Sequence, residues 1–191
     1  MRIKLSICLL VCVSLASSYT YAQSENSSRS LRALIDFTAE FGGDPVATVY
    51  FTNGEDQSVK AGQGLSLGLG GEFTVPAIQN LKIRGWVSYK YQTTMADNAD
   101  ITLTSVPINL TANWMMNNGI RFGAGLAMHN AVKFGAGGLG DDIKFANASG
   151  PLLEVGWKWI GVRYTLMEYV DGSDIYDASA IGVSLSFAFP E

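Results

Sequence analysis

Over most of the chain, apolar and polar residues alternate with a period of two. Between residues 31 and 41, for example, Ile35 and Phe37 alternate with the carboxylates Asp36 and Glu40. Such alternation is typical of a β-strand with one apolar and one polar face. It recurs in seven further segments, at 65–75, 81–92, 105–114, 120–129, 153–159, 161–166 and 181–189. The sequence therefore predicts eight strands, each about long enough to cross a bilayer when tilted.

The connections between these segments alternate between short and long. The short ones are 76–80, 116–119 and roughly 159–160, and the long or more polar ones are 42–62, 96–100, 134–150 and 170–179. Short turns on one rim and long loops on the other are typical of outer-membrane barrels. Within the first long connection, Asn53-Gly54 predicts a hairpin turn between 46–52 and 57–62. Because these arms are too short to span a membrane, we interpret them as the first two barrel strands projecting beyond it.

Side-chain volume decides which face of the predicted barrel points outward. The interior of an eight-stranded barrel has room only for its own side chains. The apolar face is rich in aromatic residues and leucines, whereas the polar face consists of glycine, serine, threonine and a few charges. A soluble, lipocalin-like barrel would place the bulky face inside. We therefore predict an all-β protein, an eight-stranded antiparallel up-and-down transmembrane β-barrel with its apolar face toward lipid.

The aromatic residues support this orientation. Tyr89 and Tyr91 fall near the long-loop rim, and so does Phe41. Eight others fall near the short-turn rim, which we predict to be a periplasmic aromatic girdle: Phe73, Trp114, Phe122, Trp157, Trp159, Tyr164, Phe187 and Phe189. Two such girdles are expected where amphipathic rings sit at the two membrane interfaces.

The N-terminus has the features of a secretory signal peptide. Arg2 and Lys4 precede an apolar stretch that ends at Ala16, and Ala22 provides a small side chain at a cleavage site. Both cysteines lie inside this segment, so the mature chain has no thiol. The predicted organisation is a signal peptide at 1–22, a flexible polar tail at 23–30 and a barrel domain at 31–191.

Composition and charge exclude several classes of protein. The 191 residues suit one domain, and 48% apolar content is too high for disorder. No stretch of about 18 apolar residues occurs beyond the N-terminus, which argues against a helical membrane span. The formal net charge is −4, and it becomes −6 when the signal and its two basic residues are removed. This acidic balance argues against nucleic-acid binding.

The last strand carries a resemblance to a known group of proteins. Phe189 is preceded at two-residue spacing by Phe187, Leu185, Val183 and Ile181. Together with the signal peptide and the eight amphipathic segments, this strand resembles small bacterial outer-membrane barrels of the OmpA, OmpX and OmpW type, over the whole mature chain. The overhanging last two residues, proline and glutamate, depart from their pattern.

The resemblance implies a location in the cell outer membrane and assembly by the barrel-assembly machinery, which reads the last strand. It also implies contact with outer-membrane lipids and lipopolysaccharide, and the chain is expected to be a monomer that binds no nucleic acid. The lumen is not apolar, which disfavours the hydrophobic-compound channel that similarity to OmpW alone would imply. A structural or surface-interaction role is then expected.

Charged residues on the polar face are the main candidate site. The residues predicted to form this site in the lumen are Asp36, Glu40, Glu72, Lys82, Arg84, Lys90, Arg121, His129, Glu154, Lys158 and Arg163. Buried charges persist when they are paired, so these residues predict either ion pairs that rigidify a closed barrel or a narrow conduit for ions or small polar solutes. Because basic residues are in excess, such a conduit would favour anions.

No catalytic, cofactor or metal site is predicted. His129 is the only histidine, and it is followed by Asn130 and Ala131 rather than by the His-x-Ser arrangement of barrel lipid A deacylases. A lipid-modifying enzyme is therefore the less favoured alternative, and we expect no enzyme activity.

The long loops are acidic and contain Asp44, Glu55, Asp56, Asp97, Asp100, Asp141, Asp142, Asp171, Asp174 and Asp177. Solvation of an exposed rim is one interpretation of these carboxylates. Binding of divalent cations that bridge lipopolysaccharide phosphates is the other.

Overall fold

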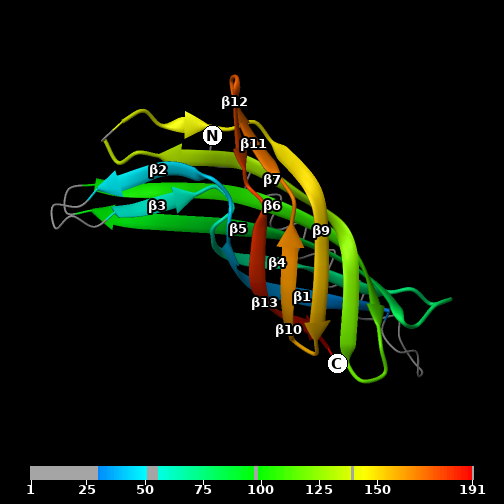
Figure 1. Cartoon of the computed structure of the whole chain (residues 1–191). Coiled ribbons are helices and arrows are strands. Elements are labelled where there is room, and N and C mark those ends of the chain that lie inside the picture. Colours follow the sequence, from blue (N-terminus) through cyan, green and yellow to red (C-terminus); the bar gives the residue numbers. More distant parts are fainter. Residues whose placement is uncertain (1–29, 51–55, 97–98, 139, 191) are drawn as a thin grey trace, which may run out of the picture.

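Antiparallel β-strands make up the described part of the chain. The computed structural model describes residues 30–50, 56–96, 99–138 and 140–190 (Figure 1). Within these ranges the strands are β1 (Leu31–Phe41), β2 (Pro45–Tyr50), β3 (Asp56–Lys60), β4 (Gly64–Thr74), β5 (Leu81–Ala96), β6 (Ala99–Met115), β7 (Ile120–Gly135), β8 (Ile143–Lys144), β9 (Ala148–Trp157), β10 (Ile160–Thr165), β11 (Glu168–Asp171), β12 (Asp174–Asp177) and β13 (Ala180–Phe189). The predicted signal peptide, residues 23–29 of the predicted tail and the Asn53-Gly54 turn lie outside the described residues.

Eight of these strands close into a barrel. The hydrogen-bonded order is β6–β5–β4–β1–β13–β10–β9–β7, and β7 pairs with β6 to complete the ring. Every neighbouring pair is antiparallel. The N-terminal strand β1 and the C-terminal strand β13 pair along a continuous register that runs from Ala33 opposite Phe189 to Phe41 opposite Ile181. The predicted eight-stranded antiparallel barrel is confirmed.

The two ends of the barrel differ. At the end that we call the turn end, the connections are the short segments 75–80, 116–119 and 158–159, and β1 begins and β13 ends there. At the opposite loop end, the connections span 42–63, 136–147 and 166–179 and contain the small strands β2, β3, β8, β11 and β12. The described residues include no helix long and apolar enough to span a bilayer.

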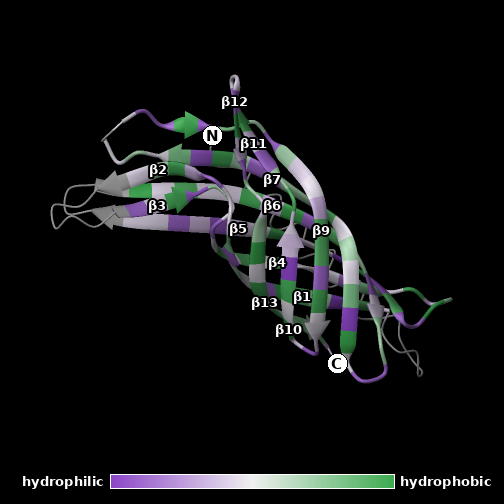
Figure 2. Cartoon of the chain, in the orientation of Figure 1, coloured by the Kyte–Doolittle hydropathy of each residue, from purple (hydrophilic) through white to green (hydrophobic). Residues whose placement is uncertain are grey.

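Hydrophobic and hydrophilic residues alternate along the barrel strands (Figure 2). The apolar side chains of this alternation are exposed on the outer surface, and the polar ones are largely buried inside the barrel. Leu67, Leu126 and Val155 are exposed on the outer surface, as are more than twenty other large apolar side chains of the chain. Two apolar residues on the polar face of the strands, Leu34 and Trp86, are buried inside the barrel. A soluble monomer does not expose an apolar surface of this extent, so the outer wall suits lipid rather than water.

Strands β5, β6 and β7 are longer than a membrane requires. They contain 16, 17 and 16 residues, whereas a tilted strand needs about 9–11 to cross. In β7 the side-chain alternation changes phase near Ala131, which has a φ of 52°, so that Val132 and Phe134 point inward. Beyond this point the inward residues of β6 and β7 are apolar. The three long strands extend past the rest of the barrel at its loop end (Figure 1).

These inward residues and the loop segments form a compact apolar cluster, which we call the loop-end core. Its buried members are Val59, Ala61, Ile101, Leu103, Val132, Phe134, Ala136, Phe145, Met167, Tyr169 and Ala178. Phe145 packs against the rings of Tyr169 and Tyr176 at centroid distances of 5.5 and 5.6 Å. The loop end is thus covered by a second, apolar layer of structure.

The loop-end hairpins differ from the prediction. Strands β2 and β3 form a separate two-stranded sheet and do not continue β1 and β4 beyond the membrane. Gly42 and Gly43 follow the last residue of β1, and Gly64 is the first residue of β4. Their φ values of 134°, 82° and 148° favour glycine and mark where the barrel strands are bounded at the loop end. The connection predicted as a long loop at 170–179 is largely a hairpin of β11 and β12. The connection predicted at 96–100 is not a long loop, because β5 and β6 pair as far as Ala96 opposite Ala99.

Candidate functional site

Glu72 on β4 gathers three cations at the turn end of the lumen. Arg32 Nη1 and Lys82 Nζ donate to Glu72 Oε1 over 3.3 and 2.8 Å, and Arg84 Nε donates to Oε2 over 2.7 Å. The strand register places Arg32 and Arg84 directly opposite Glu72 on the two neighbouring strands. The carboxylate of Glu72 is buried, and its charge is compensated by these donors.

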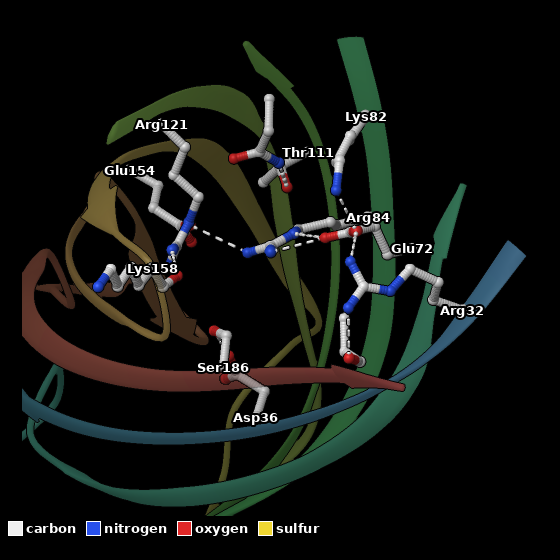
Figure 3. Close-up of polar contacts among 12 residues, drawn as sticks. Arg32, Asp36, Glu72, Lys82, Arg84, Thr111, Arg121, Glu154, Lys158 and Ser186 are labelled. Atoms are coloured by element: carbon white, nitrogen blue, oxygen red, sulfur yellow. Dashed lines mark hydrogen bonds and ion pairs between the residues drawn. The ribbon is translucent and has the colours of Figure 1, made fainter. Parts of the chain in front are cut away.

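Glu154 on β9 gathers a second group of cations deeper in the lumen. Arg121 Nε and Arg163 Nε donate to its two oxygens over 2.5 and 2.6 Å. Arg84 Nη1 lies 3.6 Å from Glu154 Oε1, so Arg84 links this carboxylate to Glu72. Figure 3 shows Arg84 extending across the lumen between the two carboxylates.

Asp36 on β1 completes this chain of charges. Arg163 Nη1 and Nη2 donate to its two oxygens over 2.7 and 2.6 Å, a bidentate geometry that strengthens the pair. Ser186 Oγ and Thr38 Oγ1 donate to the same carboxylate over 2.6 and 2.9 Å. The Arg163 guanidinium also lies 4.5 Å from the centroid of the Trp86 ring. We call the connected set Arg32, Asp36, Glu72, Lys82, Arg84, Arg121, Glu154 and Arg163 the lumen network.

A separate polar group lies nearer the loop end. Lys90 Nζ is 2.7 Å from Glu40 Oε2 and donates to the carbonyl oxygen of Gly62 over 2.7 Å. His129 Nδ1 and Tyr169 Oη form a hydrogen bond of 2.6 Å. Because Gly62 and Tyr169 belong to the loop-end segments, these contacts tie the barrel interior to the structure that covers it.

Small residues provide the space for this interior. The side chain of Trp86 lies over Gly68 and Gly70 on the neighbouring strand, where added Cβ atoms would meet the Trp86 side chain at 2.8 and 2.5 Å. A Cβ on Gly156 would likewise collide with the Arg121 guanidinium. The glycines on the polar face of the strands are therefore required by packing in the lumen.

Most of the residues predicted for the lumen meet there, and Lys158 does not. The structure places Lys158 in the two-residue turn after β9, with a φ of 53°, an exposed side chain and its Nζ 4.6 Å from the Trp157 ring centroid. The tight turn begins one residue earlier than the alternation suggests and directs this side chain out of the lumen. Its backbone carbonyl instead accepts a hydrogen bond from Arg121 Nη1.

Several members of the site were not predicted. Arg32, Thr38 and Ser186 occupy polar positions in the first and last strands, so the alternation itself could have included them. Tyr169 lies between the strand predicted at 161–166 and the connection predicted at 170–179. Its contact with His129 depends on how the hairpin of β11 and β12 folds back over the barrel. No sequence pattern identifies that contact.

Charged and polar side chains occupy the described part of the lumen. A cavity of about 20 Å³, lined by Thr38, Glu40, His129 and Arg163 among others, lies between the lumen network and the Lys90–Glu40 pair. This volume holds about one water molecule. A larger cavity of about 330 Å³ lies at the turn end and is lined by Arg32, Lys82 and Arg84 among others.

The eight aromatic residues predicted to form a girdle are all exposed on the outer surface. Tyr164 does not lie at the turn end: it is near the loop end of β10, opposite Ile181, which in turn pairs with Phe41 at the loop end of β1. Trp114 and Phe122 face each other across β6 and β7, and the Trp159 ring stacks on Phe187 at 6.0 Å. Trp159 lies in the turn after β9 rather than in the strand.

Some of the loop carboxylates hold the loops in place. Asp44 Oδ2 accepts a hydrogen bond from the backbone N–H of Asp177 over 2.9 Å, and Asp142 Oδ1 accepts one from Ala136 over 3.0 Å. Asp141 and Asp174 are exposed, Asp171 is half-buried, and Glu55 and Asp97 lie outside the described residues. In the part of the chain that the structure describes, no group of three or more histidine, cysteine or acidic side chains could hold a metal ion.

A closed ring of eight strands, an apolar outer wall and a charged, filled interior define the class of this protein as a transmembrane β-barrel. Among solved structures, the chain is similar to the attachment invasion locus protein Ail of Yersinia pestis, with a TM-score of 0.41, 10% identity, and coverage of 82% of this chain and 97% of Ail. It is also similar to Neisserial surface protein A (NspA), with a TM-score of 0.42, 11% identity, and coverage of 85% of this chain and 100% of NspA.

A second structure of Ail, in complex with the heparin analogue sucrose octasulfate, matches with a TM-score of 0.41 and 12% identity, over 82% of this chain and 97% of Ail. Comparisons with protein-family models and with curated protein sequences find no match. The assignment to the class therefore rests on the closure and surface of this barrel itself.

Proposed function

We propose that the protein is an outer-membrane β-barrel with a closed lumen and a structural or surface-interaction role, and that it is not an enzyme. The turn end would face the periplasm and the loop end the cell exterior. Export through the signal peptide at 1–22, assembly by the barrel-assembly machinery and a monomeric state belong to the same proposal. The apolar outer wall and the exposed aromatic residues near the turn end support a location in a membrane.

The lumen network carries the proposal of a closed barrel. Its carboxylates Asp36, Glu72 and Glu154 are each paired with one or more cations from other strands, and Arg84 on β5 reaches across the lumen toward Glu154 on β9. Moving an ion through this region would require several buried, hydrogen-bonded pairs to separate, at a cost of several kcal/mol for each charge left unpaired. The loop-end core adds an apolar cover above the network.

Conductance in planar lipid bilayers tests the closed lumen. The purified chain should insert, as judged by heat-modifiable electrophoretic mobility, and should give no steady unitary current at ±100 mV. Steady currents that scale with the amount of inserted protein would contradict the proposal. Those currents would instead favour a narrow conduit, and anion selectivity would then be expected from the excess of cations.

The folded structure at the loop end supports a surface role. The long strands β5, β6 and β7 and the hairpins β2–β3 and β11–β12 form an ordered projection above a common apolar core. Its exposed carboxylates include Asp141, Asp174 and Asp177. We propose that this acidic surface contacts cationic partners, or lipopolysaccharide phosphates through bridging divalent cations.

Adhesion of whole cells tests this surface. Cells that display the chain should bind surfaces coated with oligolysine more strongly than cells that display the combined variant Asp141→Asn and Asp174→Asn. The combined variant Lys133→Gln and Lys144→Gln, which neutralises exposed cations of the same region, serves as the matched control and should not weaken binding. Equal adhesion of all three would contradict a role for the acidic residues. Unchanged lipid A mass spectra on expression are expected for a protein without lipid-modifying activity.

A further inference from the structure

The cavity of about 330 Å³ at the turn end has two kinds of wall. Arg32, Lys82 and Arg84 line it together with Glu72, the carboxylate with which all three pair, and the aromatic lining residues are Trp159, Phe187 and Phe189. The cavity therefore combines cationic groups with aromatic side chains at the end of the barrel where the chain makes only short turns.

The lumen network carries more positive than negative charge. Its five cationic side chains are Arg32, Lys82, Arg84, Arg121 and Arg163, and its three carboxylates are Asp36, Glu72 and Glu154. The side chains of Arg32 and Lys82 are 22% and 17% exposed, whereas the other members are at most 5% exposed. The surplus of positive charge is thus accessible only next to the turn-end cavity.

Donor groups beside this cavity have unused capacity. Lys82 Nζ donates to Glu72, and an ammonium group has three hydrogens to donate. Arg32 donates through Nε and Nη2 to the carbonyl oxygens of Pro190 and Ala188 and through Nη1 to Glu72, which uses three of its five hydrogens. Arg84 Nη1 is buried and has no hydrogen-bond partner within the described residues. It lies 3.6 Å from Glu154 Oε1, which is an ion-pair distance but beyond a normal hydrogen bond. The excess of positive charge and the remaining hydrogens of Lys82 and Arg32 favour an additional acceptor with negative charge.

We propose that the turn-end cavity binds a phosphate-type anion, held by Lys82 and Arg32 with Arg84 behind them. A phosphate group offers several acceptor oxygens, which suit the remaining hydrogens of the Lys82 ammonium and one further hydrogen on each terminal nitrogen of Arg32. The cavity is far larger than one water molecule, so it has room for part of an ester substituent as well. The aromatic wall would contact that substituent.

Two sources of this chemistry are distinguishable by experiment. One is a free phosphate, and the other is the headgroup of an anionic phospholipid in the leaflet next to the turn end. This inference rests on the proposed function only in assigning that leaflet to the periplasmic side. Anion binding and conductance are separate measurements. Absence of anion binding would not contradict the closed lumen, and unitary currents would not contradict the anion site.

Calorimetric titration of the purified full chain in a sugar-headgroup detergent tests the proposal. Inorganic phosphate and short-chain phosphatidylglycerol are titrated separately. Binding of either supports the site and identifies its source. Lys82→Gln should weaken that binding about tenfold, because one charge-assisted contact is lost. Lys133→Gln, which removes an exposed lysine near the loop end, should leave it unchanged.

Other variants keep the proposal falsifiable if Lys82→Gln does not fold. Lys158→Gln removes an exposed cation at the cavity that lies outside the lumen network, and it should weaken binding a few-fold without loss of heat-modifiable mobility. The proposal is overturned if neither ligand binds the unaltered chain or if Lys82→Gln and Lys158→Gln bind as tightly as it does. Glu191→Gln removes the acidic side chain after Pro190. If phosphate or phosphatidylglycerol bound to this variant and not to the unaltered chain, the chain would fill its own site, and the proposal would also be overturned.

Discussion

Replacement of Glu154 by glutamine is the sharpest test of the lumen network. The substitution keeps the size of the side chain and removes the negative charge that faces Arg121, Arg163 and Arg84. Of the two charge-assisted hydrogen bonds of 2.5 and 2.6 Å, one becomes a weaker bond to the amide oxygen and the other is lost, because the amide NH2 cannot accept; such charge-assisted bonds contribute about 1.5–3 kcal/mol each. Removal of one partner from a buried ion pair costs about 3–5 kcal/mol. Because glutamine retains one acceptor oxygen, we expect the lower end, about 3 kcal/mol.

Urea unfolding in phospholipid vesicles, followed by tryptophan fluorescence, measures this change. With slopes of about 1–3 kcal/mol per molar urea, Glu154→Gln should lower the midpoint by about 1–3 M. Glu168→Gln is the matched control, because Glu168 is an exposed carboxylate on β11, and the expected change is within about 0.5 kcal/mol. A loss below about 1 kcal/mol for Glu154→Gln would refute the view that the network stabilises the barrel.

Two further substitutions test the packing of the interior. Gly156→Ala should lower the free energy of unfolding by about 1–3 kcal/mol, because its Cβ would collide with the Arg121 guanidinium, whereas Gly71→Ala, whose Cβ meets its nearest atom at 3.6 Å, should be tolerated in the same urea assay. Tyr169→Phe should cost about 1–3 kcal/mol by leaving His129 Nδ1 without its partner, and hydrogen exchange of the loop-end segments should rise with it. Unchanged exchange would show that this hydrogen bond does not hold the cover on the barrel.

The alternation of the sequence predicted the barrel strands, and the volume of the aromatic-rich apolar face predicted their orientation, because the interior of an eight-stranded barrel has no room for that face. The alternation also placed Asp36, Glu72 and Glu154 in the interior, where the structure finds them. It failed at strand ends. The alternation predicted that the side chain of Lys158 faces the lumen, but a two-residue turn after β9 directs it outward.

The projection at the loop end depends on features that a local pattern does not reveal. The phase change at Ala131 turns Val132 and Phe134 inward, and only the segments that fold over them give these residues a core to join. The separate hairpin of β2 and β3 likewise depends on contacts that the rest of the loop end provides.

By itself, the sequence determined which face of each barrel strand meets lipid and which meets the lumen, since that choice depends on the hydropathy and the volume of the two faces. Only the tertiary structure decided which charges meet. Asp36 and Ser186 are 150 residues apart, and they become neighbours because β1 and β13 pair in one register as the ring closes. Closure fixes the register of every strand relative to all the others, and the partners of Glu72, Glu154 and Asp36 follow from that register.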